Sequence, residues 1–459
     1  MATKLQNAKD EIILATMESL VPEDHLVRKL EKYIKFNFIR DLAKPYYSKK
    51  GRPGYDAVII FKIAIIKSIF GISSIRKTCE ELKVNIAYRW FLGIPFSEDI
   101  PDHSTYSKNY TNRFMGTGIY EEIFSNILEQ IIENNLLDVT SINIDSTHIK
   151  ARANKGKYID KVVEKEKSIF EEEMLEFINK KRKEDNDKPL PPNNKDDYKR
   201  KKESTSDQDS GWLHKGEKEH QFAYNAHTAC DNNGYVITSK LLPSNVHDTQ
   251  GFGEVYQNVV EKIGDEIITV AMDAGYYSGP LIKRVCDNNH LPLLPYNRTK
   301  GKKTNKAKKY LFYDEELDVY VSEDGEVYKY INTTRPGYKV YRNDKKEDIR
   351  ISIYKDYFDY VRDLRLSDFG NEKYKRRKET IERVFADFKE RHGGRYTQYK
   401  GNKKVSEHIL LTFACMNMKK MANKLSKDNL LSRLSSNIKI YLLNLVKKAL
   451  KKDMNLSYL

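Results

Sequence analysis

Three acidic residues that lie far apart in the chain occupy positions from which they could share one site. Asp145 follows Ile142 and Ile144 in a segment that alternates apolar and polar residues, a pattern typical of a strand. Asp273 ends an apolar run that we expect to be a strand buried on both faces, and Glu382 lies in a segment with helical periodicity. Converging carboxylates raise each other's pKa unless cations neutralise them, and Mg²⁺ prefers oxygen ligands. The pattern therefore predicts metal-dependent chemistry.

Each acid alone has a simpler interpretation. An aspartate at a strand end is commonly a cap or turn residue, and Glu382 beside Arg383 could form a surface ion pair of little energetic value. Their joint placement is more specific, because an adjacent apolar stripe lets the helix dock on a sheet. That stripe consists of Ile381, Val384 and Phe388. A helix docked in this way brings Glu382 to the sheet edge where the two aspartates emerge.

The elements around the acids predict a mixed α/β sheet. We expect strands over 139–148 and 291–296, a strand within 266–277 and two strands around the turn Asn233-Gly234, a strong hairpin signal. Helices are expected over 249–262, with Asp248 as its cap, over 280–289 and over 374–394, the last ending at a glycine pair.

The chain is expected to have three parts. Residues 1–136 form an all-helical N-terminal domain, 137–425 form the α/β domain and 426–459 form a basic helical tail. The α/β domain carries insertions at about 151–215, partly helical over 159–182, and at about 297–370.

The most apolar run, at 57–72, is predicted to be a buried helix whose two lysines, Lys62 and Lys67, reach the surface. It is too short and too charged to span a bilayer comfortably, so no membrane partner is expected.

Charge and cysteine usage narrow the class of protein. The 459 residues carry a formal net charge of +15, which attracts polyanions such as nucleic acid. The four cysteines form no CxxC pair, which argues against a zinc site and a disulfide scaffold and favours the cytoplasm. In the helical domain, three arginines are candidates to grip duplex DNA: Arg52, Arg76 and Arg89. The alternative is an all-helical interaction domain.

Several strings of residues, in order along the chain, carry a family resemblance. They include GRPGYD (51–56) and PDHSTYSK (101–108) in the helical part, and NIDSTHIKA (143–151), HQFAYNAHTA (220–229), SNVHD (244–248), MDAGY (272–276) and IERVFADFK (381–389) in the α/β part. The chain resembles the IS1182-type transposases, within the broader IS4/IS5 group of DDE transposases. Asp248 lies in one of these strings, although helix capping explains it without chemistry.

The resemblance implies a ribonuclease H-like catalytic core, with which the order of elements is compatible. It implies a catalytic triad of Asp145, Asp273 and Glu382 that holds two Mg²⁺ ions, with Mn²⁺ able to substitute. It further implies an insertion-sequence transposase, nucleoid-associated in a bacterial cytoplasm, that cleaves double-stranded DNA at terminal inverted repeats and joins it to target DNA. Pairing two ends makes a homodimer the expected assembly.

The family's signature around the glutamate is Tyr, two residues, Arg, three residues, Glu, six residues, Lys. Glu382 and Lys389 match it, and two residues separate Tyr374 from Arg377, but four residues separate Arg377 from Glu382. Either the register is looser here or Lys378 takes the arginine role. We expect Tyr374, Arg377, Lys378 and Lys389 to contact DNA, mainly through phosphates, which confers affinity rather than sequence specificity.

Two other functions remain open. The chain could be a ribonuclease H-like nuclease that cuts DNA without joining it, or a DNA-binding protein with a dead catalytic core. The intact acid trio counts against the second.

Overall fold

The computed structural model describes residues 14–48, 50, 54–164, 170–192, 198–216, 219–295 and 311–433. The chain divides into two compact units, one formed by Met1–Asn135 with Leu411–Leu459 and the other by Leu136–Leu410. Residues 411–425, which the sequence led us to place in the α/β domain, thus group with the helical unit. Residues 434–459 of the expected basic tail (426–459) lie outside the described residues.

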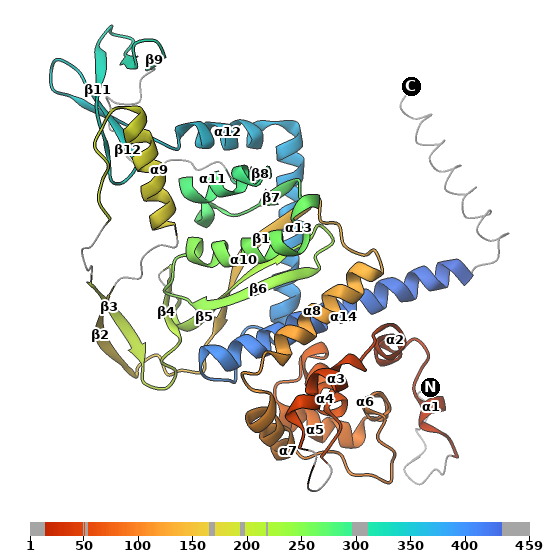
Figure 1. Ribbon diagram of the computed structural model, residues 1–459. Helices are drawn as coiled ribbons and strands as arrows, with labels where there is room; N and C mark the ends of the chain where they lie inside the picture. Colours follow the sequence, from red (N-terminus) through yellow and green to blue (C-terminus); the bar gives the residue numbers. More distant parts are fainter. Residues whose placement is uncertain are drawn as a thin grey trace, which may run out of the picture. The chain divides into compact units, whose positions relative to one another are not determined.

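The first unit is helical throughout its described part (Figure 1). Its elements are α1 (Met17–Leu20), α2 (Leu26–Tyr33), α3 (Phe38–Ala43), η1 (Lys44–Tyr46), α4 (Ala57–Ile69), α5 (Ile75–Val84), α6 (Ile86–Leu92), α7 (His103–Asn109), η2 (Tyr110–Phe114), α8 (Ile119–Glu133) and, from Leu411, α14 (Asn402–Arg433). Helix α4 is the centre of its core, because it is apolar on every side and almost all of its side chains are buried. In the described part of the chain, no helix is long and apolar enough to cross a membrane.

The two lysines of α4 do not reach the surface as the sequence led us to expect. Lys62 and Lys67 are both buried. The Lys62 ammonium forms an ion pair with Glu31 (2.6 Å) and donates a hydrogen bond to the carbonyl oxygen of Phe91 (2.8 Å). The prediction was wrong because α4 is packed on all sides, which leaves its lysines no open face.

The second unit is built on a six-stranded mixed sheet. Its strands are β1 (Ser141–Lys150), β4 (Gly211–Lys215), β5 (Glu219–Cys230), β6 (Val236–Pro243), β7 (Thr269–Ala271) and β8 (Leu291–Leu293). The order is β4-β5-β1-β7-β8, with β6 pairing β5 beyond the stretch that β4 occupies. β5 is antiparallel to β1, whereas β7 and β8 are parallel to it. The mixed sheet and the hairpin at Asn233-Gly234 are confirmed.

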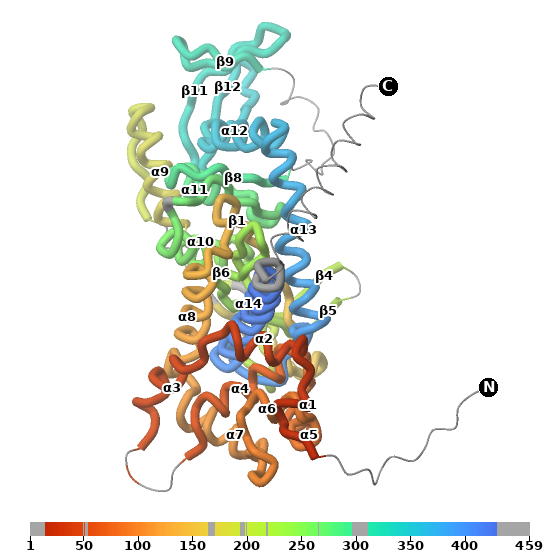
Figure 2. The backbone as a smooth tube through the Cα atoms, turned by 90° about the vertical axis from the view of Figure 1, so that its right-hand side faces the viewer, coloured from red at the N-terminus to blue at the C-terminus, as the bar shows by residue number. Residues whose placement is uncertain are grey.

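Helices cover both faces of this sheet. They are α10 (Asp248–Ile263), α11 (Gly279–Asp287), α12 (Lys355–Leu366) and α13 (Asp368–Arg391), with the short turns η3 (Gly264–Glu266) and η4 (Ala274–Tyr276) between them. Figure 2 shows α10 and α13 on opposite sides of the sheet. The apolar stripe predicted on α13 is confirmed, since Ile381, Val384 and Phe388 are buried.

The chain after α13 ties this helix to β1. The backbone N–H of Lys150 donates to the carbonyl oxygen of Arg395 (3.0 Å), and Lys150 forms a parallel bridge with Tyr396. The turn between helix and bridge is tight, because a Cβ on Gly394 would lie 2.2 Å from the ring of Phe388. Helix α13 is therefore fixed along β1 both by its apolar stripe and by main-chain bonds.

The first insertion contains a two-stranded ribbon, β2 (Tyr158–Glu164) and β3 (Tyr198–Ser204), and a helix, α9 (Glu171–Glu184). The expected helix over 159–182 is thus wrong for residues 159–164. These residues are strand because they pair with β3, some forty positions later, and a local helical pattern cannot reveal such a partner.

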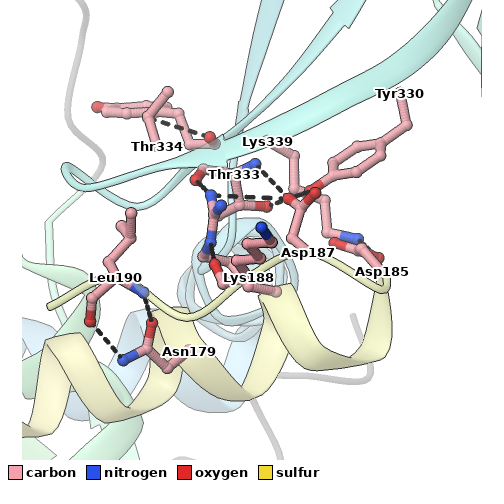
Figure 3. A network of polar contacts seen from close by, with 11 residues as sticks. Asn179, Asp185, Asp187, Lys188, Leu190, Tyr330, Thr333, Thr334 and Lys339 are labelled. Atoms are coloured by element: carbon pink, nitrogen blue, oxygen red, sulfur yellow. Dashed lines mark hydrogen bonds and ion pairs between the residues drawn. The ribbon is translucent and has the colours of Figure 1, made fainter.

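The second insertion is an antiparallel five-stranded sheet against which α9 is fastened. Its strands are β9 (Phe312–Asp314), β10 (Val319–Val321), β11 (Val327–Thr334), β12 (Tyr338–Arg342) and β13 (Asp348–Ser352). Figure 3 shows the polar contacts at this junction, where the Asp187 carboxylate accepts a hydrogen bond from the Tyr330 hydroxyl (2.6 Å) and Asp185 forms an ion pair with Lys339 (2.7 Å). Helix α9 of the first insertion and the five-stranded sheet of the second insertion are therefore joined, whereas the ribbon of β2 and β3 forms a separate sheet.

Candidate active site

Asp145 lies in the middle of the sheet. Its strand β1 is flanked by β5 and β7, and the preceding Ile144 is fully buried. The Asp145 side chain is only 15% exposed, and one of its oxygens accepts the backbone N–H of Ser146 (2.8 Å). Burial raises the pKa of Asp145 to about 6; the Arg377 guanidinium opposes this rise, and the negative charge of Asp273 adds to it.

Asp273 reaches the same sheet end from the neighbouring parallel strand. The last cross-strand pair of β1 and β7 is Asn143 with Ala271, and each aspartate stands two residues beyond its strand's member of that pair. Asp273 opens the turn η4, where its carboxylate accepts the backbone N–H of Gly275 (2.8 Å). Burial raises its pKa, and the Gly275 hydrogen bond partly offsets the rise. Burial thus raises the pKa of both carboxylates, and the charge of Asp273 raises that of Asp145 further.

Glu382 is connected to this pair through Arg377. The Arg377 guanidinium forms an ion pair with the Asp145 carboxylate, and its other terminal nitrogen lies 3.5 Å from Oε1 of Glu382. The Arg377 side chain is 7% exposed, whereas that of Glu382 is 49% exposed. The structure therefore brings two of the three predicted acids, Asp145 and Glu382, to one arginine, with the glutamate at the solvent side, while the charge of this arginine partly offsets the rise that burial causes in the pKa of Asp273.

The register question left open by the sequence has a geometric answer. Arg377 is buried and contacts two of the acids, while the adjacent Lys378 is exposed. Tyr374 is half-buried, and the guanidinium carbon of Arg365 lies over its ring, 4.4 Å from the ring centre. Lys389 is half-buried, and burial lowers its pKa. The spacing of four residues between the arginine and Glu382 is thus no obstacle to their contact.

The arginines predicted in the helical unit have different environments. Arg76 is exposed, and its guanidinium lies 3.1 Å from the His103 ring. Arg89 is buried and donates hydrogen bonds to the carbonyl oxygens of Ile94 (3.2 Å) and Pro95 (2.6 Å). Arg52 lies outside the described residues.

A fourth acid lies beside the site. Asp248 was expected to cap α10, but the cap is His247, whose side chain accepts the backbone N–H of Thr249, and Asp248 is the first helical residue. Oδ1 of Asp248 accepts a hydrogen bond from the hydroxyl of Ser146 (3.0 Å), the neighbour of Asp145. The family string SNVHD (244–248) could have identified this aspartate as a candidate site residue. We did not include it because helix capping explained it.

The donor set suits a hard divalent cation, although the side chains do not already form a binding cage. Among the described residues, no group of three or more His, Cys, Asp or Glu side chains has the geometry to hold a metal ion. At Asp145 and Glu382 the neutralising charge is the guanidinium of Arg377. One arginine cannot neutralise the converging aspartates and Glu382, so the site keeps an excess of negative oxygen ligands.

Comparison with known families gives the class of protein to which this site belongs. Residues 140–418 match the family described as Transposase DDE domain, and residues 15–112 match the one described as Transposase domain (DUF772). The first match covers more than half of the chain, so the protein belongs to the DDE transposases. The two domains together are those of IS1182-type transposases, the family that the sequence motifs resemble. A search of curated proteins finds no match.

Proposed function

We propose that this insertion-sequence transposase binds the ends of its element and catalyses metal-dependent DNA cleavage and strand transfer at Asp145, Asp273 and Glu382. The observation that carries the proposal is the meeting of Asp145 and Asp273 at one end of two parallel strands, with Arg377 joining the first of them to Glu382. These three acids come from widely separated parts of the chain. A purely structural role does not require buried aspartates with raised pKa values to be gathered there.

The sheet supports a ribonuclease H-like core. The three long strands β1, β5 and β6 form an antiparallel meander. On the other side of β1, the sheet continues with β7 and β8, which are parallel to β1. Helix α13 packs on this sheet and carries the third acid. This arrangement places the first acid on the central strand, the second after its neighbour and the third on a helix.

The triad would hold two Mg²⁺ ions, with Mn²⁺ able to substitute. The bound ions supply activation of a water or of a DNA 3′ hydroxyl and stabilisation of the leaving oxygen. Around them, Arg377 orients the carboxylates of Asp145 and Glu382 by its two contacts. Ile144 and Ile381, which precede Asp145 and Glu382 in the chain, are buried and fix the backbone at each of these acids. Residues of the protein thus position the reaction, and no covalent protein–DNA intermediate is required.

DNA contacts are proposed for basic residues of α13 and of the helical unit. Lys378 follows Arg377 on the solvent side of α13, and Lys389 lies three turns further along the same helix. Arg76 is exposed on α5, and Arg52 is proposed from the sequence alone. Arg89 is occupied by backbone carbonyls, so we do not include it in this surface. The partner is double-stranded DNA, namely terminal inverted repeats and target, bound by a homodimer.

The test is a reaction of the full chain with a labelled end fragment, a target plasmid and Mg²⁺ or Mn²⁺. We expect cleaved ends and joined products, both abolished by Asp145→Asn, Asp273→Asn and Glu382→Gln while binding of the end is retained. Asp387→Asn is the matched control, because Asp387 lies on the same helix in a surface pair with Arg391 (3.4 Å). Cleavage without joining would identify a nuclease, and binding alone would identify an inactive DNA-binding protein.

A further inference from the structure

A fourth carboxylate borders the proposed triad from the opposite face of the sheet. Asp248 stands at the start of α10, which covers the face away from α13 (Figure 2). Its Oδ1 accepts the hydroxyl hydrogen of Ser146 at 3.0 Å. Ser146 follows Asp145 on β1. A hydrogen bond therefore connects the first residue of α10 to the residue beside Asp145.

The turn after the second acid shows how closely Asp248 approaches. A Cβ placed on Gly275 would lie 2.9 Å from Oδ2 of Asp248 and 3.1 Å from Oδ1 of Asp273. Both carboxylates therefore border the same small space over Gly275. Any side chain at this position would have to push the Asp248 carboxylate aside, and a glycine is what allows the two acids to approach.

In the described part of the chain, none of the Lys, Arg or His side chains lies within ion-pair distance of the Asp248 carboxylate. The two nearby histidines do not supply a charge at neutral pH. Burial lowers the pKa of His148, and burial lowers the pKa of His227 to about 4 against the opposing charge of Asp248.

Helix geometry does not account for these contacts. The first turn of a helix favours an acidic residue, and this effect alone would explain an aspartate at the first position of α10. This effect would not explain why the Asp248 carboxylate accepts a hydrogen bond from Ser146 or why it shares the space over Gly275 with Asp273. The capping function itself is performed by His247.

We propose that Asp248 is a fourth acidic residue of the catalytic centre, and that its negative charge strengthens the binding of the divalent cations. The inference rests on the proposed function, because it concerns the cation site of the triad. Asp248 acts on that site through its charge and through Ser146 and the η4 turn, and it is thus a positioning residue.

The test is titration of the full chain with Mn²⁺. Binding is measured by calorimetry and by the loss of the electron paramagnetic resonance signal of free Mn²⁺. Asp248→Asn keeps the size and the hydrogen-bond acceptor but removes the charge, and we expect its Kd for Mn²⁺ to rise about tenfold or more. Glu254→Gln is the matched control, since it removes an exposed acid of the same helix that is paired with Lys240 (2.5 Å). Its Kd should equal that of the wild type.

A second variant changes the position of the acids without removing any charge. Gly275→Ala keeps every acid but crowds the carboxylates of both Asp248 and Asp273, and we expect a rise in Kd for Mn²⁺ with an unchanged far-ultraviolet circular dichroism spectrum. Wild-type affinity in folded Asp248→Asn would overturn the inference, and if that variant does not fold, wild-type affinity in folded Gly275→Ala would do so. Failure of the proposed function gives another result: the wild type itself would then show no Mn²⁺ binding that Asp145→Asn removes.

Discussion

Arg377 forms an ion pair with Asp145 while its other terminal nitrogen lies 3.5 Å from Oε1 of Glu382. The first and third acids, 237 positions apart in the numbering, are thus held by one buried side chain. A buried cation between two carboxylates offsets part of the cost of burying them, and its removal leaves those charges uncompensated.

Arg377→Ala should therefore disable the site without preventing DNA binding. We expect the rate of end cleavage to fall roughly 10²-fold or more, as for the loss of one preorganised charged donor in an enzyme site. Arg376→Ala is the control, because Arg376 is an exposed neighbour paired with Glu372 (3.0 Å). Single-turnover cleavage of a labelled end measures both, and equal rates for the two variants would show that Arg377 has no special part in the site.

Lys378→Gln should weaken DNA binding rather than chemistry. Lys378 is exposed beside the site, so we expect a uniform loss of affinity across DNA sequences and a salt slope smaller by about one. The control is Arg362→Gln on α12, whose guanidinium is already paired with Asp359 (2.8 Å). Fluorescence anisotropy at several salt concentrations gives the slopes. A slope identical to that of the wild type would remove Lys378 from the DNA surface.

Lys67→Met should stabilise the helical unit at neutral pH. Burial lowers the pKa of Lys67 to about 8, whereas the unfolded chain keeps it near 10.5, so below pH 8 folding must bury a charge. The substitution should raise the free energy of unfolding by about 1–3 kcal/mol at pH 7.

The pH dependence of that gain tests its cause. The folded wild type binds fewer protons than the unfolded chain between pH 8 and 10.5, so its stability rises with pH relative to Lys67→Met in that window. The difference in melting temperature between the two proteins should therefore be largest below pH 8 and shrink towards pH 10.5. A difference that does not depend on pH would point to packing instead of charge.

Gly211→Ala should destabilise the second unit, Leu136–Leu410. A Cβ on Gly211 would lie 2.5 Å from the backbone nitrogens of both Ser244 and Asn245, and backbone cannot move aside as a side chain can. We expect a loss of about 1–3 kcal/mol in the free energy of unfolding, the usual cost of overpacking. Gly156→Ala, whose Cβ would meet its nearest neighbour at 3.5 Å, should be nearly neutral. Equal urea midpoints for the two variants would contradict this packing.

Local patterns predicted the parts of the site that depend on local structure. The alternation of apolar and polar residues around Ile142, Ile144 and Asp145 was enough to predict the strand β1. The apolar stripe at Ile381 and Val384 was enough to predict which face of α13 packs on the sheet. Both signals reflect side-chain periodicity, which is set by the geometry of strand and helix.

Contacts between distant segments could not be predicted in the same way. The burial of Lys62 depends on Glu31 and on a carbonyl of another helix, and the strand at 159–164 depends on a partner in β3. Asp248 was set aside because a helix start explains an aspartate locally, whereas its approach to Gly275 follows from the packing of α10 on the sheet. Sequence spacing holds no information on these distances.

We propose that the segments around Asp145, Asp273 and Glu382 share one divalent-cation site. Replacing Mg²⁺ by Fe²⁺ and adding ascorbate and peroxide generates radicals that cut the backbone next to the bound metal. If one site holds the metal, cuts are expected near all three residues, suppressed by excess Mg²⁺ and lost together in Asp145→Asn. Cuts confined to one segment, or persisting in that variant, would contradict it.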